Sequence, residues 1–138
     1  MKPGLFLDTS AWFAALSDRD QNHARAVRYY RDVLTAGKFA LVTTNLVIAE
    51  LHAMVSRRQG PAPGLRLLDG LRADPRHEVV WVTRELSWRA VDRWIRPFAD
   101  QPFSLVDAVG FEVMRERGLR TAFSTDHHFK VAGFEVVP

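Results

Sequence analysis

The sequence predicts an α/β fold built on a central parallel sheet of about five short strands. Short apolar segments alternate along the chain with longer segments of helical periodicity. Strands that are apolar throughout and separated by helices are typical of parallel sheets covered on both faces. The chain has 138 residues, which is the size of one hydrophobic core. We therefore expect residues 1–138 to form a single domain.

The N-terminal elements are a short strand and two helices. Residues 5–8 form an apolar run that predicts a buried strand, and Ser10 is a suitable N-cap for a short helix over residues 11–16. A longer helix is predicted from residue 22 to residue 36. Gly37 follows it and is the expected stop, because glycine readily adopts the left-handed conformation that ends helices.

The middle of the chain predicts a second strand and two helices. Residues 39–42 are apolar and form the strand, and helices follow over residues 44–58 and 63–73. Residues 60–64, between these helices, have the sequence GPAPG, which is typical of a loop.

The last third of the chain predicts three strands and two helices. The first strand covers residues 78–82, and the helix after it covers residues 85–98. Ser104 is the expected N-cap of the next helix, which ends at Gly118. Two further apolar runs complete the sheet as strands, at residues 122–124 and 134–137.

Charge and composition narrow the classes of function. The chain carries 19 Lys and Arg residues against 16 Asp and Glu residues, and its net charge is +3. All but three of the basic residues are arginine, which favours bidentate contacts with phosphate, so nucleic acid is the first candidate partner. A mildly basic enzyme with another substrate is the alternative. Cysteine is absent, which excludes thiolate metal sites, cysteine nucleophiles and disulfides.

No segment has the length and apolarity of a signal peptide or a membrane span. The apolar run at residues 5–7 ends at Asp8, and the run at residues 46–55 is interrupted by Glu50 and His52. We expect a cytoplasmic protein that has no contact with a membrane.

Two aspartates lie at the carboxyl ends of predicted strands. Asp8 follows residues 5–7, and Asp126 follows residues 122–125. The carboxyl ends of parallel strands lie along one edge of the sheet, where α/β folds place their binding sites. The simpler alternative is that each acid closes an Asx turn or caps the next helix.

Glu50 lies on a helix, on the side that the sequence pattern assigns to the core. At 100° per residue, Leu46 and Met54 bracket it on the helical wheel. An unpaired carboxylate among apolar side chains would be costly, so this position calls for a cation. The alternative is a buried ion pair with Arg57, two turns further along the same side.

Asp107 occupies a similar position on its own helix. It lies between Phe111 and Met114 on the wheel, away from the charged side that Glu112 marks. The alternative is structural, because Ser104 and Asp107 have the spacing of a capping box. The capping box explains an acid in the first turn but does not explain the apolar side.

The four acids together predict a metal centre, because carboxylates that converge in one cleft repel each other unless a cation joins them. Oxygen-rich acidic sites select Mg²⁺ or Mn²⁺ over softer metals. Such an ion suits phosphodiester hydrolysis, because it polarises the phosphoryl oxygen and activates a water molecule. The residues thus point to a metal-dependent nuclease. The alternatives are a catalytically silent nucleic-acid-binding module and a scaffold whose acids serve only as caps and ion pairs.

Four motifs, in this order and spacing, resemble those of a PIN-domain ribonuclease, and they are most similar to those of the VapC toxin group. The resemblance covers nearly the whole chain. The motifs are LDTSAW at residues 7–12, TT at residues 43–44 with Glu50 on the next helix, FSLVD at residues 103–107, and FSTDHHF at residues 123–129 with Gly133 and Phe134 after it.

The resemblance implies a three-layer α/β/α sandwich and a Mg²⁺- or Mn²⁺-dependent endoribonuclease with one or two ions. It implies RNA as substrate, a homodimer, and a small antitoxin protein as partner. A PIN nuclease that processes RNA or cuts single-stranded DNA, without a toxin role, is the alternative. The residues it assigns to catalysis and to the metal are Asp8, Glu50, Asp107 and Asp126, with Thr9, Ser104 and Ser124 as supporting polar residues.

Several other residues are candidates for parts of the site. Arg89, Arg93 and Arg96 fall on one side of their helix and could contact RNA phosphates, although a solvated helix face is the simpler interpretation. His128 stands where many relatives of the resembled family carry Asp. His127 and His128 could contact the metal or phosphate, but we expect them to be ordinary loop residues, since an all-oxygen Mg²⁺ site does not favour imidazole.

Overall fold

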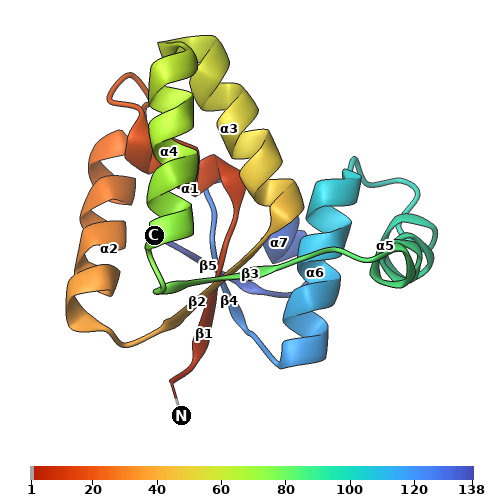
Figure 1. Ribbon diagram of the computed structural model, residues 1–138. Coiled ribbons are helices and arrows are strands. Elements are labelled where there is room, and N and C mark those ends of the chain that lie inside the picture. Colours follow the sequence, from red (N-terminus) through yellow and green to blue (C-terminus); the bar gives the residue numbers. More distant parts are fainter. Residues whose placement is uncertain (1) are drawn as a thin grey trace.

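The computed structural model describes residues 2–138, and a five-stranded sheet forms its centre (Figure 1). The strands are β1 (Gly4–Leu7), β2 (Ala40–Thr44), β3 (His77–Val80), β4 (Thr121–Phe123) and β5 (Glu135–Val137). Every pair of neighbouring strands is parallel, and their order is β3-β2-β1-β4-β5. The predicted parallel sheet of about five short strands is confirmed.

Helices cover the sheet on both sides. They are α1 (Thr9–Leu16), α2 (His23–Ala36), α3 (Asn45–Gln59), α4 (Pro61–Ala73), α5 (Arg84–Ala90), a π-helical turn η1 (Val91–Ile95), α6 (Leu105–Arg117) and α7 (His128–Val131). Helices α1–α4 lie together on one side, and α5–α7 lie on the other (Figure 1). The three-layer α/β/α sandwich is therefore confirmed. Among residues 2–138, no helix combines the length and hydropathy that a membrane crossing requires.

Most predicted helix ends agree with the structure. Helix α2 ends at Gly37 (φ 62°) and α6 ends at Gly118 (φ 66°), both in the left-handed conformation. At the start of α6, Ser104 and Asp107 form a complete capping box. The capping box fixes where α6 begins, and its Asp107 is one of the predicted site acids.

Two predictions in the first half of the chain are wrong. Ser10 does not cap α1; it lies inside the helix, and its hydroxyl donates to the Asp8 carboxylate instead. Residues 60–64 are not a loop, because α4 starts at Pro61 and only Gly60 separates it from α3. A proline in the first helical turn lacks an N–H that would have no partner there anyway, so the GPAPG segment tolerates the helix.

The predicted helix over residues 85–98 is also interrupted. It starts as α5, changes to the π-helical turn η1 and ends near Ile95. In the same part of the fold, α6 is buried around its middle because α5 and η1 cover one side of it. Glu112 is therefore fully buried, where the sequence pattern placed it in solvent.

The side of α3 that faces the core differs from the prediction. Its buried residues are Val47, Leu51 and Val55, whose stripe is centred about 100° away from Glu50 on the wheel. The polar side packs on α4, where Gly64 lies against Ser56; a Cβ at Gly64 would meet the Ser56 hydroxyl at 2.2 Å. The remaining side is solvated. Glu50 is thus exposed, and it forms no buried ion pair with Arg57 among the described residues.

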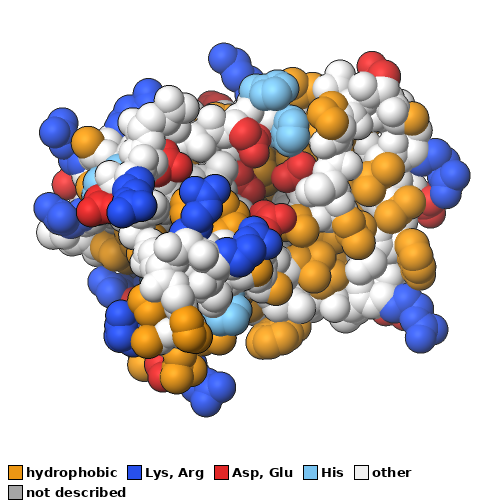
Figure 2. Space-filling model, turned by 90° about the horizontal axis from the view of Figure 1, so that it is seen from above, with side chains coloured by type: hydrophobic (Ala, Val, Ile, Leu, Met, Phe, Trp, Pro, Cys, Tyr) orange, Lys and Arg blue, Asp and Glu red, His pale blue; other side chains and the backbone are white. Residues whose placement is uncertain are grey.

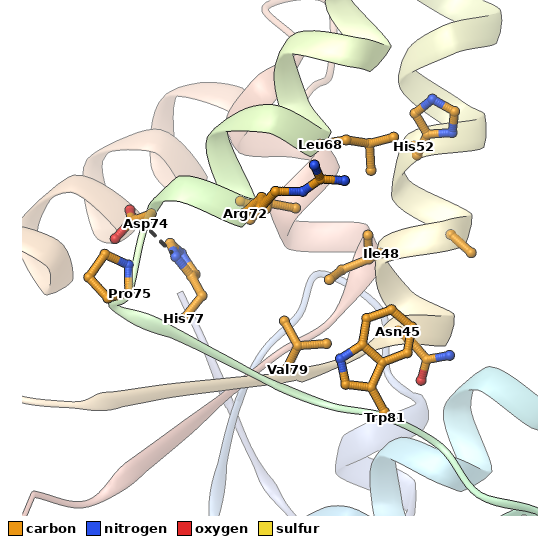
Figure 3. Close-up of a pocket in the computed structure, with 12 residues that line it drawn as sticks. Asn45, Ile48, His52, Leu68, Arg72, Asp74, Pro75, His77, Val79 and Trp81 are labelled. Atoms are coloured by element: carbon orange, nitrogen blue, oxygen red, sulfur yellow. Dashed lines mark ion pairs between the residues drawn. The ribbon is translucent and has the colours of Figure 1, made fainter.

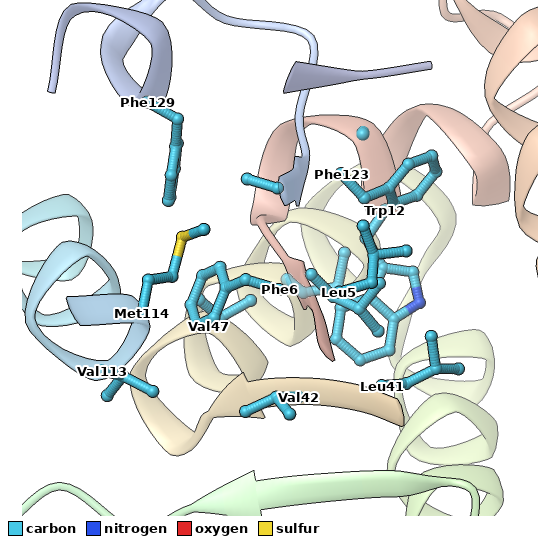
Figure 4. Packing of buried hydrophobic residues seen from close by; sticks show 14 of the residues in the cluster. Leu5, Phe6, Trp12, Leu41, Val42, Val47, Val113, Met114, Phe123 and Phe129 are labelled. Carbon is cyan, nitrogen blue, oxygen red and sulfur yellow. The ribbon is translucent and has the colours of Figure 1, made fainter. Parts of the chain in front are cut away.

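An aromatic cluster joins β1 to α6 and α7. Phe6, Phe111 and Phe129 are each 0% exposed, and the Phe111 and Phe129 rings meet edge to face at 4.8 Å. The side chains of Phe6, Met114 and Phe129 lie together in this part of the core (Figure 4). Burying a side chain of this size contributes about 1.5–3 kcal/mol, so the cluster holds both helices firmly on the sheet.

Glycine allows the close approach of α6 to β1. A Cβ at Gly110 would lie 3.0 Å from two atoms of the buried Phe6 ring, which has no free space to move into. Asp107 lies one turn before Gly110 on the same helix. The close packing therefore brings the start of α6, with Asp107, toward the carboxyl end of β1.

Candidate active site

The predicted site lies where the sheet changes direction. The chain lays down β1, β2 and β3 in one direction and then returns to place β4 on the other side of β1. Asp8 directly follows β1, and its backbone N–H donates to Phe123 O at the end of β4 (3.1 Å). Asp126 comes three residues after β4. Parallel α/β sheets bind ligands at such a point, outside the carboxyl ends of the strands.

Two serine hydroxyls hold the buried Asp8 carboxylate. Asp8 is 3% exposed, and its Oδ2 accepts hydrogen bonds from Ser10 Oγ (2.7 Å) and Ser124 Oγ (2.8 Å). The two hydroxyls also lie 3.0 Å apart, and the Thr125 backbone N–H donates to Ser10 Oγ. This network ties α1 to the loop after β4 and fixes the orientation of the Asp8 carboxylate.

The pKa of Asp8 is raised to about 7. Burial is the largest cause, followed by repulsion from Asp126; Asp107 adds a smaller repulsion, while the hydrogen bonds from Ser10 and Ser124 lower the pKa. A carboxylate that is both desolvated and surrounded by other carboxylates favours a bound proton or a bound cation. The structure thus brings Asp8, Asp107 and Asp126 within electrostatic reach of one another.

This pKa shift predicts how the metal-free protein responds to pH. The pKa of Asp8 is near 4 in the unfolded chain and about 7 in the folded one, so stability is lost as pH rises from about 4 to 7. The full loss is roughly 4 kcal/mol in the free energy of unfolding. The substitution Asp8→Asn is expected to remove this pH-dependent loss of stability, because asparagine does not titrate.

Urea denaturation in EDTA at several pH values measures this effect. The free-energy difference between Asp8→Asn and wild type is expected to grow between pH 4 and pH 7 and to level off above pH 7. A difference that does not vary with pH would show that the Asp8 carboxylate carries no such penalty.

Asp107 and Asp126 form a second part of the site together with His128. Each of the three offers one donor atom, and these atoms lie within 4.8 Å of one another. Asp107 Oδ2 accepts from the Ser104 backbone N–H at 3.0 Å, and it lies 3.1 Å from His128 Nδ1. Asp126 Oδ1 accepts from the His128 backbone N–H at 2.8 Å. The capping box and the metal hypothesis are compatible, because each carboxylate has two oxygens.

The donor set at this place fits a divalent cation. Three carboxylates converge there, and no lysine or arginine pairs with any of them among residues 2–138. Oxygen donors suit hard divalent cations, and the chain has no thiolate to compete. Figure 2 shows acidic side chains gathered in a hollow of this face, with histidines and basic side chains beside them.

Glu50 is not brought into this contact network. It lies on α3, which starts directly after β2, so it belongs to the same edge of the sheet. Its side chain is exposed, and it has no hydrogen bond or ion pair with the other three acids among the described residues. Its assignment as a metal ligand therefore stays a prediction.

The three supporting polar residues have different surroundings. Ser124 holds Asp8, and Ser104 caps α6 through Asp107. The Thr9 hydroxyl is buried and has no hydrogen-bond partner within residues 2–138. Ser124 and Ser104 thus each contact a site acid.

The three arginine side chains that are candidates for RNA binding all have partners within the chain. They lie on α5 and η1 and at the end of η1, on the far side of α6 from the sheet. Their contact with RNA stays a prediction. The ion pairs join Arg89 to Glu116 (2.9 Å), Arg93 to Glu112 (3.0 Å) and Arg96 to Asp92 (3.2 Å).

Two residues contact the site acids in ways that the sequence pattern does not predict. Ser10, a predicted helix cap, binds Asp8, and His128, a predicted loop residue, starts helix α7. Both lie two residues after a site acid, in the sequences DTS and DHH. An Asp side chain often accepts from the backbone N–H two residues further on, as Asp126 does from His128, so this spacing is the signal that could have placed both residues beside the site.

A separate cavity lies away from the acids. It has a volume of about 720 Å³ and opens between α3, α4 and the edge strand β3 (Figure 3). Ile48, Leu68, Val79 and Trp81 line it with mainly apolar side chains. None of the site acids lines this cavity, so it is separate from the candidate active site.

Comparison with known proteins agrees with the resemblance in the motifs. The PIN domain family matches residues 5–135. The 23S rRNA-specific endonuclease VapC20 of Mycobacterium tuberculosis is 34% identical over 141 residues, covering 97% of this chain and 98% of the relative. The crystal structure of M. tuberculosis VapC20, described as a sarcin–ricin loop cleaving toxin, has a TM-score of 0.84 at 33% identity and covers 98% of this chain and 100% of that one. VapBC2 from Rickettsia felis, bound to a DNA fragment from its promoter, shares the fold at a TM-score of 0.67 and 16% identity, covering 96% of each chain.

Proposed function

The chain belongs to the PIN-domain family, and from this premise we propose that it is a Mg²⁺- or Mn²⁺-dependent endoribonuclease and the toxin of a toxin–antitoxin pair. One observation carries the catalytic part of the proposal. Three carboxylates, Asp8, Asp107 and Asp126, converge at the switch point of a parallel sheet, and no lysine or arginine among residues 2–138 pairs with them. A divalent cation is the partner that this arrangement lacks.

Each part of the site has a defined task in phosphodiester hydrolysis. Asp8, Asp107 and Asp126 would hold one or two ions, and Glu50, which is exposed at the same edge of the sheet, would be a further ligand. A bound divalent cation supplies charge stabilisation at the phosphoryl oxygens and a more acidic water. Ser10 and Ser124 donate to Oδ2 of Asp8, which leaves the other carboxylate oxygen free of these hydroxyls and available to hold an ion. No separate general base is needed for this chemistry.

The names of the relatives support ribosomal RNA as the substrate of this chain. The M. tuberculosis relative that covers nearly the whole chain is named as specific for 23S rRNA, and its crystal structure is described as that of a sarcin–ricin loop cleaving toxin. We extend this to the present chain and place the activity in the cytoplasm, where ribosomes are assembled. RNA maturation or cleavage of single-stranded DNA is the alternative within the same family.

A small antitoxin protein is the proposed partner, and the homodimer implied by the motifs is the proposed assembly. The description of the VapC20 structure as a toxin supports the first of these. An antitoxin would have to cover the acidic hollow or exclude RNA from it. Association of two copies is measured by light scattering of the purified protein.

Cleavage of a defined RNA tests the proposed activity. Purified protein is incubated with a transcript that contains the sarcin–ricin loop of 23S rRNA, in Mg²⁺, in Mn²⁺ and in EDTA, and cuts are mapped by primer extension. We expect one dominant cut in either metal and none in EDTA. A loop of scrambled sequence is the control. Cleavage in EDTA, or the absence of cleavage of RNA and of single-stranded DNA in both metals, would contradict the proposal.

Controlled expression separates a toxin from a processing enzyme. Expression of the wild-type chain from a repressible promoter is expected to stop growth, while Asp8→Asn at the same protein level is expected to be harmless. Normal growth with an active wild-type nuclease would favour the RNA-processing alternative.

A further inference from the structure

We propose that His128 binds the divalent cation directly through Nδ1, so that the metal centre has a nitrogen ligand beside its carboxylates. This inference rests on the proposed metal dependence of the nuclease. It assigns a role to a residue that the sequence pattern treated as part of a loop.

The position of the His128 ring supports this role. Its Nδ1 lies 3.1 Å from Asp107 Oδ2 and 4.0 Å from Asp126 Oδ1. All three donor atoms fall within 4.8 Å of one another, a spacing at which one ion can bind them together. The ring therefore occupies the same small volume as the two carboxylates to which the metal is assigned.

The backbone and the neighbouring side chains hold His128 in place. Its N–H donates to Asp126 Oδ1, and the next residue, Phe129, is completely buried in the aromatic cluster. The ring of Phe103, itself buried, meets the His128 ring edge to face at 5.8 Å. The His128 side chain is 20% exposed, so it lies at the border of the core rather than free in solvent. Such support from a surrounding shell is what a metal ligand requires.

His127 provides a natural contrast. It is adjacent in sequence and carries the same side chain, but it is exposed and has no hydrogen bond or ion pair with the site acids among the described residues. Its ring lies 4.9 Å from that of His128. A change at His127 therefore alters the charge and composition of the same surface without removing the proposed ligand.

A nitrogen ligand changes which metal the centre prefers. Mg²⁺ favours oxygen ligands, whereas imidazole suits first-row transition ions. The centre is therefore expected to bind Mn²⁺ more tightly than Mg²⁺. In His128→Asp, which makes the ligand set all oxygen, the ratio of Mn²⁺ to Mg²⁺ affinity is expected to fall by at least roughly tenfold.

Electron spin-echo spectroscopy of bound Mn²⁺ tests the ligand without measuring catalysis. Spectra are recorded for the wild-type chain at saturating Mn²⁺, once with natural histidine and once with ¹⁵N-histidine. We expect a nitrogen modulation that changes with the isotope, that disappears in His128→Asp, and that persists in the matched variant His127→Asp. Isothermal calorimetry on the same samples gives the Mn²⁺ and Mg²⁺ affinities.

Each outcome decides one question. Bound Mn²⁺ without a histidine nitrogen signal in the wild type, or with a signal that survives in His128→Asp, would overturn the role of His128 and leave the carboxylate centre intact. A wild-type chain that binds no Mn²⁺ would overturn both this inference and the proposed metal-dependent function. The wild type alone overturns the role of His128 if bound Mn²⁺ shows no isotope-sensitive nitrogen signal, even when a variant does not fold, and the two variants assign a signal that is present to one of the neighbouring rings.

Discussion

Replacing Asp8 with asparagine is expected to lower the rate of metal-dependent RNA cleavage by about 1,000-fold or more and to leave the fold intact. Asparagine keeps the size of the side chain and an oxygen that accepts from Ser10 and Ser124. It removes a negative charge that is 3% exposed and that faces two further acids. The stabilisation that a bound metal gives the transition state is worth several kcal/mol, which corresponds to this factor.

Initial cleavage rates at saturating Mg²⁺ measure this effect. Asp100→Asn is the matched control, because Asp100 is an exposed acid near the sequence of the third motif and outside the contact network of the site. We expect the control to cleave at close to the wild-type rate. Circular dichroism shows whether both variants fold. Cleavage by Asp8→Asn at the wild-type rate would contradict the assignment of Asp8.

Replacing Glu112 with alanine is expected to give the second large effect, a loss of about 3 kcal/mol in the free energy of unfolding. Glu112 is 0% exposed. Its Oε1 accepts from Trp94 Nε1 and lies 3.0 Å from Arg93 Nε, while Arg89 and Arg115 approach Oε2 at 4.0 Å and 3.8 Å. Alanine leaves the Trp94 N–H without its partner and opens a cavity between α6 and η1.

The expected loss lies at the low end for a broken buried pair, for a reason visible in the structure. The three arginine side chains are each more than 40% exposed, so water replaces part of what they lose. Urea denaturation measures the change, with Glu116→Ala as control, since Glu116 pairs with Arg89 at the surface. We expect the control to cost less than about 1 kcal/mol. A loss as small in Glu112→Ala as in the control would show that the buried carboxylate does not hold η1 on α6.

The sequence was most informative where chain direction alone decides position. Asp8 and Asp126 follow strands, and parallel strands point their carboxyl ends to one edge of the sheet, so their proximity follows from the fold class. Gly37 and Gly118 end helices for a purely local reason, the left-handed backbone. Such features need no knowledge of how helices pack.

Helix orientation was less predictable, because it depends on neighbours that are distant in sequence. The helical wheel directs Glu50 toward the core, yet α4 packs on the polar side of α3 through Gly64 and leaves Glu50 in solvent. The wheel directs Glu112 toward solvent, yet α5 and η1 cover it. In both cases the wheel gave the correct angular spacing, and the tertiary contact that chose the buried side could not be read from it.

Ser10 and His128 illustrate a finer limit. Each lies two residues after a site acid, and each contacts a site acid through its side chain. The composition of the site, three carboxylates with two hydroxyls and an imidazole, follows from the start of α1 after β1, the loop after β4, and the starts of α6 and α7. The residue types were visible in the sequence, but their orientation depends on backbone angles in short turns.

The central claim is that the acids at the carboxyl ends of β1 and β4, with Asp107 of α6, form the metal centre of a nuclease. A crystal of the wild-type chain soaked in Mn²⁺, with diffraction data collected for anomalous scattering, tests it most directly. The strongest anomalous peak is expected between the carboxylates of Asp8, Asp107 and Asp126. A strongest peak elsewhere on the chain, or no peak among these three acids at saturating Mn²⁺, would contradict it.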